Sequence, residues 1–271
     1  MLQRAVLVSA AIALCAVASG AQTLAGSPDV ALDVVGTVVG PADVTDDLTA
    51  VPPAGIDLGP LPDGAEVTAY APFPGAGELF ALEHTLDLPG GVTARPVDVV
   101  LWDGATYSIA LSGAGTFPDS AGIDALSFVP ATSAIWISLD TTAEVVGNLF
   151  RDADVFDGAL GIVFDASAAG VPAGLDVDAV SAIAGSSDLL LSFDVGGTLG
   201  GVTFDDEDVL RYDPVGNTWA LELEPALQIP GWETADLDAL HLVPEPQQVL
   251  GLVAGALLLA GLHRRRAEGR S

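Results

Sequence analysis

The stretch that decides the fold is "GIDALSFVP" at residues 122–130, because close copies of it return twice along the chain. It recurs as "GLDVDAVSAI" at 174–183 and as "ADLDALHLVP" at 235–244. Self-similarity at a spacing of tens of residues is typical of repeat architectures, in which each repeat is one supersecondary unit. We therefore expect a chain built from repeated units.

Further apolar segments follow the repeated stretch in a constant order: a strand-like run, an acidic segment with an apolar centre, and an alternating run. The strand-like runs are "ELFALEH" (78–84), "AIWISLD" (134–140) and "DLLLSFD" (188–194). Asp103, Asp157 and Asp213 mark the same turn in successive units. Short segments rich in β-branched and aromatic residues, separated by Gly, Pro, Asp and Asn, are typical of antiparallel strands. Each unit is predicted to hold four strands.

The two ends of the repeat region complement each other. Residues 29–51, "DVALDVVGTVVGPADVTDDLTAV", resemble residues 188–210, so the chain is expected to enter at the second strand of a unit. It leaves at a first strand, "DLDALHL" (236–242). We predict an all-β fold, a small four-bladed β-propeller closed by the C-terminal strand, because four strands in about 50 residues is the size of a propeller blade. A β-sandwich or an open β repeat array is the alternative.

The charge balance is strongly acidic. The chain has 37 Asp and Glu residues against eight basic residues, all of them arginine. Residues 22–243 contain 35 of the acids and only Arg95, Arg151 and Arg211. Such a field repels polyanions, which excludes nucleic acid as a partner. Half of the residues are apolar, so the acidic region is expected to fold.

The N-terminus has the features of a secretory signal peptide. Arg4 precedes an apolar stretch over 5–18, and small residues then lead to a cleavage site before Gln22. We predict residues 1–21 as the signal peptide. Cys15, the single cysteine, lies in that segment, so the mature chain is expected to contain no disulfide.

The C-terminus, "VPEPQQVLGLVAGALLLAGLHRRR" (243–266), combines three unlike elements. Two prolines separate the apolar run 249–262 from the preceding domain, because proline breaks helices. Arg264, Arg265 and Arg266 follow the run, where positive charge holds that end in the cytoplasm and long side chains extend a short span. We predict a C-terminal transmembrane helix with residues 22–243 outside the cell.

These elements, in this order, resemble the PEP-CTERM sorting signal of exported bacterial proteins. The resemblance covers residues 243–271 only, and it departs from the pattern mildly because "AEGRS" trails the arginines. It implies recognition by an exosortase-type membrane enzyme, carried by Pro244, Glu245 and Pro246. It further implies removal of the tail near these residues and delivery to the surface or an exopolysaccharide matrix. The tail implies nothing about the domain at 22–243, because what precedes such tails varies widely.

Clustered carboxylates are the strongest candidates for a cofactor site. Asp152 and Asp154 belong to one unit, and Asp205, Asp206 and Asp208 to the next. Such oxygen ligands could bind calcium, although no complete calcium-loop pattern is present. A solvated acidic turn is the other interpretation. No further cofactor is predicted.

Catalytic patterns are lacking. The mature chain has no cysteine and no Gly-x-Ser-x-Gly, and His84 and His241 are not at zinc-ligand spacing. Trp102, Trp136 and Trp219 are expected in the core, with a sugar-stacking rim as the alternative. We predict a non-enzymatic surface or matrix protein that interacts with polysaccharide or other surface components. A calcium-dependent adhesion module and a secreted glycan hydrolase with two acting carboxylates stay open.

Overall fold

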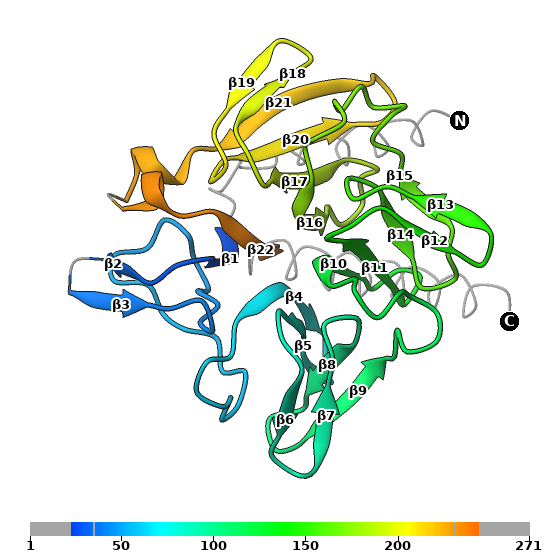
Figure 1. Cartoon of the computed structure of the whole chain (residues 1–271). Helices are drawn as coiled ribbons and strands as arrows, with labels where there is room; N and C mark the ends of the chain where they lie inside the picture. Colours follow the sequence, from blue (N-terminus) through cyan, green and yellow to red (C-terminus); the bar gives the residue numbers. More distant parts are fainter. Residues whose placement is uncertain (1–22, 35, 230, 244–271) are drawn as a thin grey trace, which may run out of the picture. The chain divides into compact units, whose positions relative to one another are not determined.

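The copies of the repeated stretch form the first strand of each sheet in the computed structural model, which describes residues 23–34, 36–229 and 231–243. These strands are β10 (Ile123–Val129), β16 (Val177–Ala182) and β22 (Leu237–Val243), and β4 (Val67–Phe73) is a fourth of the same kind. Each contacts the next in a closed series: β4 with β10, β10 with β16, β16 with β22, and β22 with β4. They therefore surround a common centre (Figure 1).

The fold is all-β, with repeated four-stranded antiparallel sheets. The three complete sheets have the orders β4-β5-β8-β9, β10-β11-β14-β15 and β16-β17-β20-β21. Their further strands are β5 (Gly77–Leu82), β8 (Val99–Trp102), β9 (Tyr107–Leu111), β11 (Ala134–Leu139), β14 (Val155–Asp157), β15 (Ile162–Phe164), β17 (Leu189–Phe193), β20 (Val209–Asp213) and β21 (Thr218–Leu223). The prediction of repeated antiparallel four-stranded units is thus confirmed.

The turn between the third and fourth strands is the one that the sequence predicted. Asp103 Oδ1 accepts the backbone N–H of Thr106 at 2.7 Å, and Asp213 Oδ1 accepts that of Val215 at 2.8 Å. Asp157 Oδ1 accepts the N–H of Gly161 at 2.8 Å. An aspartate that binds backbone groups just ahead of it holds a tight turn, which explains why it returns in every complete unit.

A small hairpin between the second and third strands was not predicted as separate strands. The four hairpins are β2 (Leu32–Val34) with β3 (Thr37–Val39), β6 (Leu86–Leu88) with β7 (Val92–Ala94), β12 (Ala143–Val145) with β13 (Asn148–Phe150), and β18 (Gly197–Leu199) with β19 (Val202–Phe204). Gly200 and Gly201 form the turn of the last hairpin, with φ of 57° and 90°, and Gly197 begins β18.

The two ends of the described chain pair with each other. β1 (Thr23–Pro28) runs antiparallel to β22, with Thr23 opposite Val243. The start of this unit needs a correction, because the second strand lies before Asp29 and not within 29–35. Asp29 corresponds to Asp194 at the end of β17: each accepts the N–H that begins a first strand, at 2.9 and 2.8 Å. The alignment used for the prediction was therefore shifted by one short segment.

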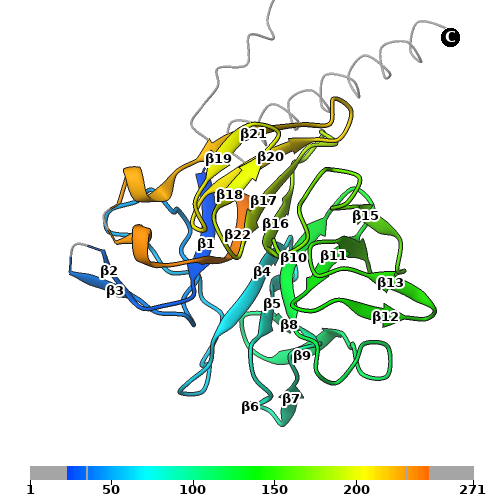
Figure 2. The ribbon, with the colours of Figure 1, turned by 45° about the horizontal axis from the view of Figure 1, so that its top comes forward.

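The outer half of this split unit is reduced. Isolated bridges join Gly26 to Thr45 and Thr45 to Gly55, where the complete units have a third and a fourth strand. Two short 3-10 helices, η1 (Pro225–Leu227) and η2 (Trp232–Thr234), lie between β21 and β22 along the chain. Figure 2 shows them on the side of β1 and of the hairpin β2–β3.

Aromatic side chains fill the core between neighbouring sheets. Trp102 and Trp219 are buried, and Trp136 is partly buried against the core cluster that contains Trp219. Trp102 lies against Tyr107 across β8 and β9, and Trp219 against Tyr212 across β20 and β21, with 4.7 Å between ring centroids in both pairs. The expectation of core packing is confirmed for these two tryptophans.

The predicted export and sorting segments, 1–21 and 244–271, lie outside the described residues. They include the predicted transmembrane helix and the proposed sorting residues Pro244, Glu245, Pro246, Arg264, Arg265 and Arg266. Within the part of the chain that the structure describes, no helix is long and apolar enough to cross a membrane.

Candidate functional site: carboxyl groups at the centre of the domain

The repeated stretch places an aspartate at the same position of three inner strands. Asp124, Asp178 and Asp238 each precede an alanine in β10, β16 and β22, and Thr68 takes this position in β4. These three strands contact one another, so the recurring position converges at the centre of the domain. The negative charges of Asp124 and Asp238 both act on Asp178.

Burial makes these carboxyl groups resist ionisation. Asp178 is only 8% exposed. Burial raises its pKa, and the charges of Asp124, Asp236 and Asp238 raise it further. Burial, followed by the charges of Asp236 and Asp29, raises the pKa of Asp238 to about 8. Burial and the charge of Asp176 likewise raise the pKa of Asp124. A carboxyl in such a place is held in its neutral form at near-neutral pH.

One oxygen of Asp178 has no partner. Its Oδ2 atom is buried and accepts no hydrogen bond from the residues that the structure describes. A proton shared between carboxyl groups resolves this: hydrogen bonding to Asp178 lowers the pKa of both Asp124 and Asp236, while the bond to Asp236 raises that of Asp178. A buried charge without a donor would be costly, so the geometry favours a protonated Asp178.

A rim of further acids surrounds the entry to this cluster. Asp176 and Asp236 each lie two residues before a central aspartate. Burial, then the charge of Asp152, raises the pKa of Asp176 to about 7. At one corresponding strand end, Asp140 Oδ1 accepts the N–H of Gly122 at 2.8 Å. The rim therefore also anchors the beginning of inner strands.

Further along the inner strands, hydroxyl groups link neighbours. Ser127 Oγ accepts the N–H of Ala182 at 3.0 Å, and Ser181 Oγ accepts that of Leu242 at 2.9 Å. His241 takes the corresponding position in β22, and the residue it would meet in β4 is Pro72, which has no N–H. This explains why the buried His241 Nδ1 has no partner among the described residues. Burial lowers the pKa of His241 to about 4, so its ring is neutral.

Two of the predicted calcium ligands hold turns. Asp154 accepts the backbone N–H groups of Arg151 and Ala166, both at 3.0 Å. Asp208 accepts the N–H of Asp205 at 2.9 Å. Each of these buried aspartates thus binds the chain three residues earlier, directly before the third strand.

Asp152 and Asp206, two of the other predicted ligands, lie nearer to the centre, whereas Asp205 donates its backbone N–H to Asp208 in the turn. The charge of Asp152 acts on Asp176 and that of Asp206 on Asp236, so both border the central cluster. In residues 23–34, 36–229 and 231–243, no group of three or more His, Cys, Asp or Glu side chains is arranged to hold a metal ion. The calcium site stays a prediction. The central aspartates were missed as a site, although their recurrence within the repeated stretch was visible.

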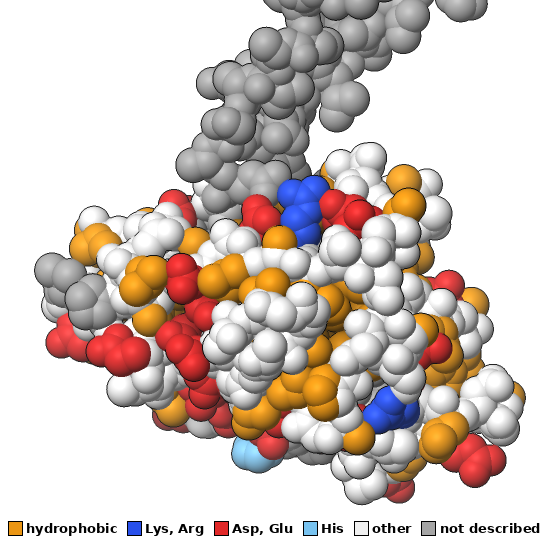
Figure 3. Space-filling view, turned by 90° about the horizontal axis from the view of Figure 1, so that it is seen from above, with side chains coloured by type: hydrophobic (Ala, Val, Ile, Leu, Met, Phe, Trp, Pro, Cys, Tyr) orange, Lys and Arg blue, Asp and Glu red, His pale blue; other side chains and the backbone are white. Residues whose placement is uncertain are grey.

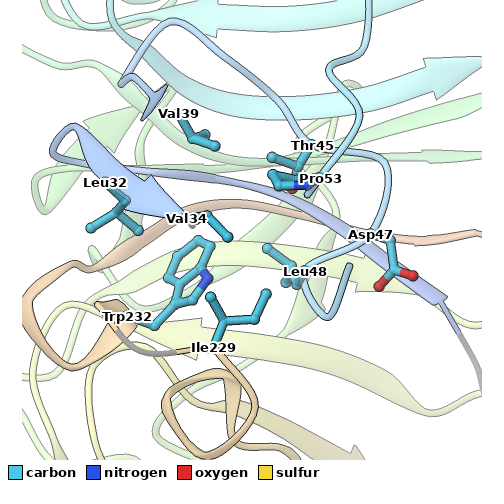
Figure 4. Close-up of a pocket in the computed structure, with 9 residues that line it drawn as sticks. All are labelled: Leu32, Val34, Val39, Thr45, Asp47, Leu48, Pro53, Ile229 and Trp232. Carbon is cyan, nitrogen blue, oxygen red and sulfur yellow. The ribbon is translucent and has the colours of Figure 1, made fainter. Parts of the chain in front are cut away.

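Beside the central carboxyl groups, an open hollow of about 350 Å³ is lined by residues 72–78 and Asp103, at the turn between β4 and β5. The carboxylates spread over the face in Figure 3, where the basic side chains form isolated spots. A cavity of about 10 Å³ lies in the split unit, lined by Leu32, Val34, Val39, Thr45, Asp47, Leu48, Pro53, Ile229 and Trp232 (Figure 4). It has room for about one water molecule and is a packing defect, because ligand pockets are far larger.

The comparisons with known proteins concern the arrangement of the chain. No protein-family model and no curated protein matches it. Among solved structures it is similar to a protein of unknown function from Bacteroides caccae, with 10% identity, a TM-score of 0.33, and coverage of 73% of this chain and 71% of the other. It is also similar to YCF48 bound to a D1 peptide, with 11% identity, a TM-score of 0.29, and coverage of 74% and 70%. Likenesses this low carry no functional argument. The fold itself defines the class: an all-β protein of repeated four-stranded antiparallel sheets.

Proposed function

We propose that the chain is an exported, non-enzymatic protein of the cell surface or exopolysaccharide matrix, with residues 22–243 forming a four-bladed β-propeller closed by β22. The observation that carries the propeller part of this proposal is the pairing of β1 with β22, and the export and sorting part rests on the sequences of the terminal segments 1–21 and 243–271. Because the inner strands also contact one another in a closed series, the split unit counts as the fourth blade.

The position of the closing sheet supports a module that is processed at both ends. The predicted signal cleavage falls just before β1, and the Pro-Glu-Pro motif begins directly after Val243. Removal of both segments would therefore leave β1 and β22 whole. An exosortase-type enzyme is the expected partner of the tail, and polysaccharide or other surface components are the expected partners of the domain.

The decisive test follows the fate of the tail in a bacterium with and without an exosortase-type enzyme. Replacing Pro244, Glu245 and Pro246 by alanine should block processing, so that the precursor stays in the membrane fraction. Replacing Gln247 and Gln248 by alanine is the matched control and should leave processing intact. Processing of the alanine variant at the normal rate would refute the sorting assignment.

The arginine cluster gives a second, separable readout. Replacing Arg264, Arg265 and Arg266 by serine removes the positive charge that stops translocation, so membrane retention of the precursor should weaken. Fractionation and protease protection of a C-terminal epitope would show this. Full retention of the serine variant would contradict the predicted topology.

A further inference from the structure

We propose that the carboxyl cluster of Asp124, Asp178 and Asp238 is a proton-linked switch: the folded domain keeps it protonated, and rising pH weakens the contact between the inner strands. Its geometric basis is the convergence of one repeated position from β10, β16 and β22. The buried Oδ2 of Asp178, which has no partner among the described residues, is the second observation, because a protonated carboxyl avoids the cost of a buried charge without a donor.

Every charged neighbour identified around Asp178 is an acid. β10 supplies Asp124, and β22 supplies Asp236 and Asp238. On its own strand, Asp176 acts on Asp124. The outer neighbours are Asp29, Glu66, Glu83, Asp140, Asp152, Asp194 and Asp206. From β4 only the uncharged Thr68 faces this level, and its hydroxyl donates to the carbonyl oxygen of Ile123 at 2.6 Å.

Cations do not offset these charges. The ion pairs within the described residues join Arg211 to Asp188 and to Glu222. His84 is exposed and acts on Glu83, an outer member of the rim. Protons on the carboxyl groups would remove this repulsion and let the inner strands approach one another.

The direction of the pH effect follows from the raised pKa values. A carboxyl in the unfolded chain titrates near pH 4. In the folded domain the pKa is about 7 for Asp176 and about 8 for Asp238, and that of Asp178 is also raised. The folded state binds more protons between these values, so the stabilisation is complete below pH 4 and is lost as pH rises through the folded pKa values. The window is about pH 4 to 8 for Asp176 and Asp238, and it extends to higher pH for Asp178, whose pKa is raised to about 11.

Urea unfolding of the full-length chain in mild detergent, from pH 4 to pH 9, measures this uptake. For each proton bound on folding, the folded-to-unfolded ratio should fall about tenfold per pH unit. Asp178→Asn keeps the shape but cannot ionise, so it should lower the slope by about one proton and raise stability at pH 8. The matched control is Glu144→Gln, which removes the same charge from the exposed hairpin β12–β13 and should keep the wild-type slope.

Each outcome decides the proposal. Equal slopes for Asp178→Asn and Glu144→Gln would overturn it, as would a wild-type stability that rises from pH 5 to pH 8. If Asp178→Asn does not fold, Asp238→Asn is measured in the same way and carries the same expectation. Urea unfolding at pH 8 with and without calcium completes the test. Stabilisation of the wild type but not of Asp178→Asn by calcium would replace the proton by a bound cation and refute the switch.

Discussion

The complete unit β16-β17-β20-β21 contains a four-stranded sheet, whereas the split unit around β1 and β22 contains a two-stranded sheet. Both have two inner strands and a small hairpin, and both have an aspartate that accepts an N–H three residues earlier: Asp208 from Asp205 and Asp43 from Gly40. Beyond that point the complete unit continues into two outer strands, and the split unit keeps only two bridges. The inner strands are thus common to both units, and the outer strands are reduced in the split unit.

Removal of β22 is the severest challenge to this comparison. A chain ending at Ala235 should aggregate or fail to fold, while a chain ending at Val243 should melt normally. The deletion removes Leu237, Leu240 and Leu242, all buried, whose burial contributes about 5 to 9 kcal/mol. That is comparable with a domain's whole net stability of about 5 to 15 kcal/mol. Thermal melts of the two truncations would show it; equal melting temperatures would mean that closure is not needed.

Gly26→Ala adds one carbon atom, the Cβ, to the β1–β22 sheet and so tests how tightly this sheet is packed. A Cβ at Gly26 would lie 2.6 Å from the carbonyl oxygen of Ala239 and 2.8 Å from Leu237 Cδ1. We expect a loss of about 2 to 3 kcal/mol, at the upper end of what overpacking costs. Gly55→Ala, in the loop that replaces the outer strands, is the control, because no described atom lies within 4 Å of its added Cβ. Urea midpoints compare the two, and similar losses would mean that the closing sheet is not tightly packed.

Asp154→Ala against Asp43→Ala sharpens the contrast between the outer halves. Asp154 is buried and accepts two backbone N–H groups, whereas Asp43 is exposed and accepts one. Hydrogen bonds to charged groups contribute about 1.5 to 3 kcal/mol each, so Asp154→Ala should lose about 3 kcal/mol and Asp43→Ala about 1 kcal/mol. The free energy of unfolding from urea titration measures both. A larger loss at Asp43 would reverse the ranking of the two units.

The smallest effect concerns the hairpins that all units share. Val146 turns β12 into β13 with φ of 50°, a conformation that a β-branched residue adopts at a cost, and its side chain is 78% exposed. Val146→Asn creates the Asn-Gly pair that such turns prefer and should add about 0.5 to 1 kcal/mol to stability. Leu149→Asn, on the same exposed hairpin, should add nothing. An equal gain in stability from Val146→Asn and Leu149→Asn would mean that the loss of exposed apolar surface, and not the turn conformation, causes the stabilisation.

The sequence predicted the repeated units correctly, but it did not predict β4, the first strand of the first complete unit, or β1, the second strand of the split unit. β10, β16 and β22 were visible because Asp and Ala recur within an apolar run. β4 escaped notice because Thr68 replaces the aspartate and proline ends the match. β1, with the sequence TLAGSP, has weak strand propensity and is a strand because β22 pairs with it, a tertiary effect that no local pattern contains.

The same distinction applies to the candidate site. The recurring aspartate is visible in the sequence, but the sequence does not show that these carboxyl groups lie close together in the folded chain. Asp124, Asp178 and Asp238 approach one another only because their strands face a common centre. The predicted calcium ligands share only their closeness along the chain. They therefore include turn-holding residues such as Asp154 and rim residues such as Asp152.

Because β1 pairs with β22, folding of the domain can be completed only after β22 has been synthesised. β1 is made first and β22 last, and the bond between Asp29 and Asp236 spans 207 residues. Contacts so distant in the chain form slowly and only after everything between them exists. Until then β1 is an edge awaiting a partner, and a chain that stops early never supplies one. Closure of the sheet therefore marks a chain that has been synthesised at least as far as β22.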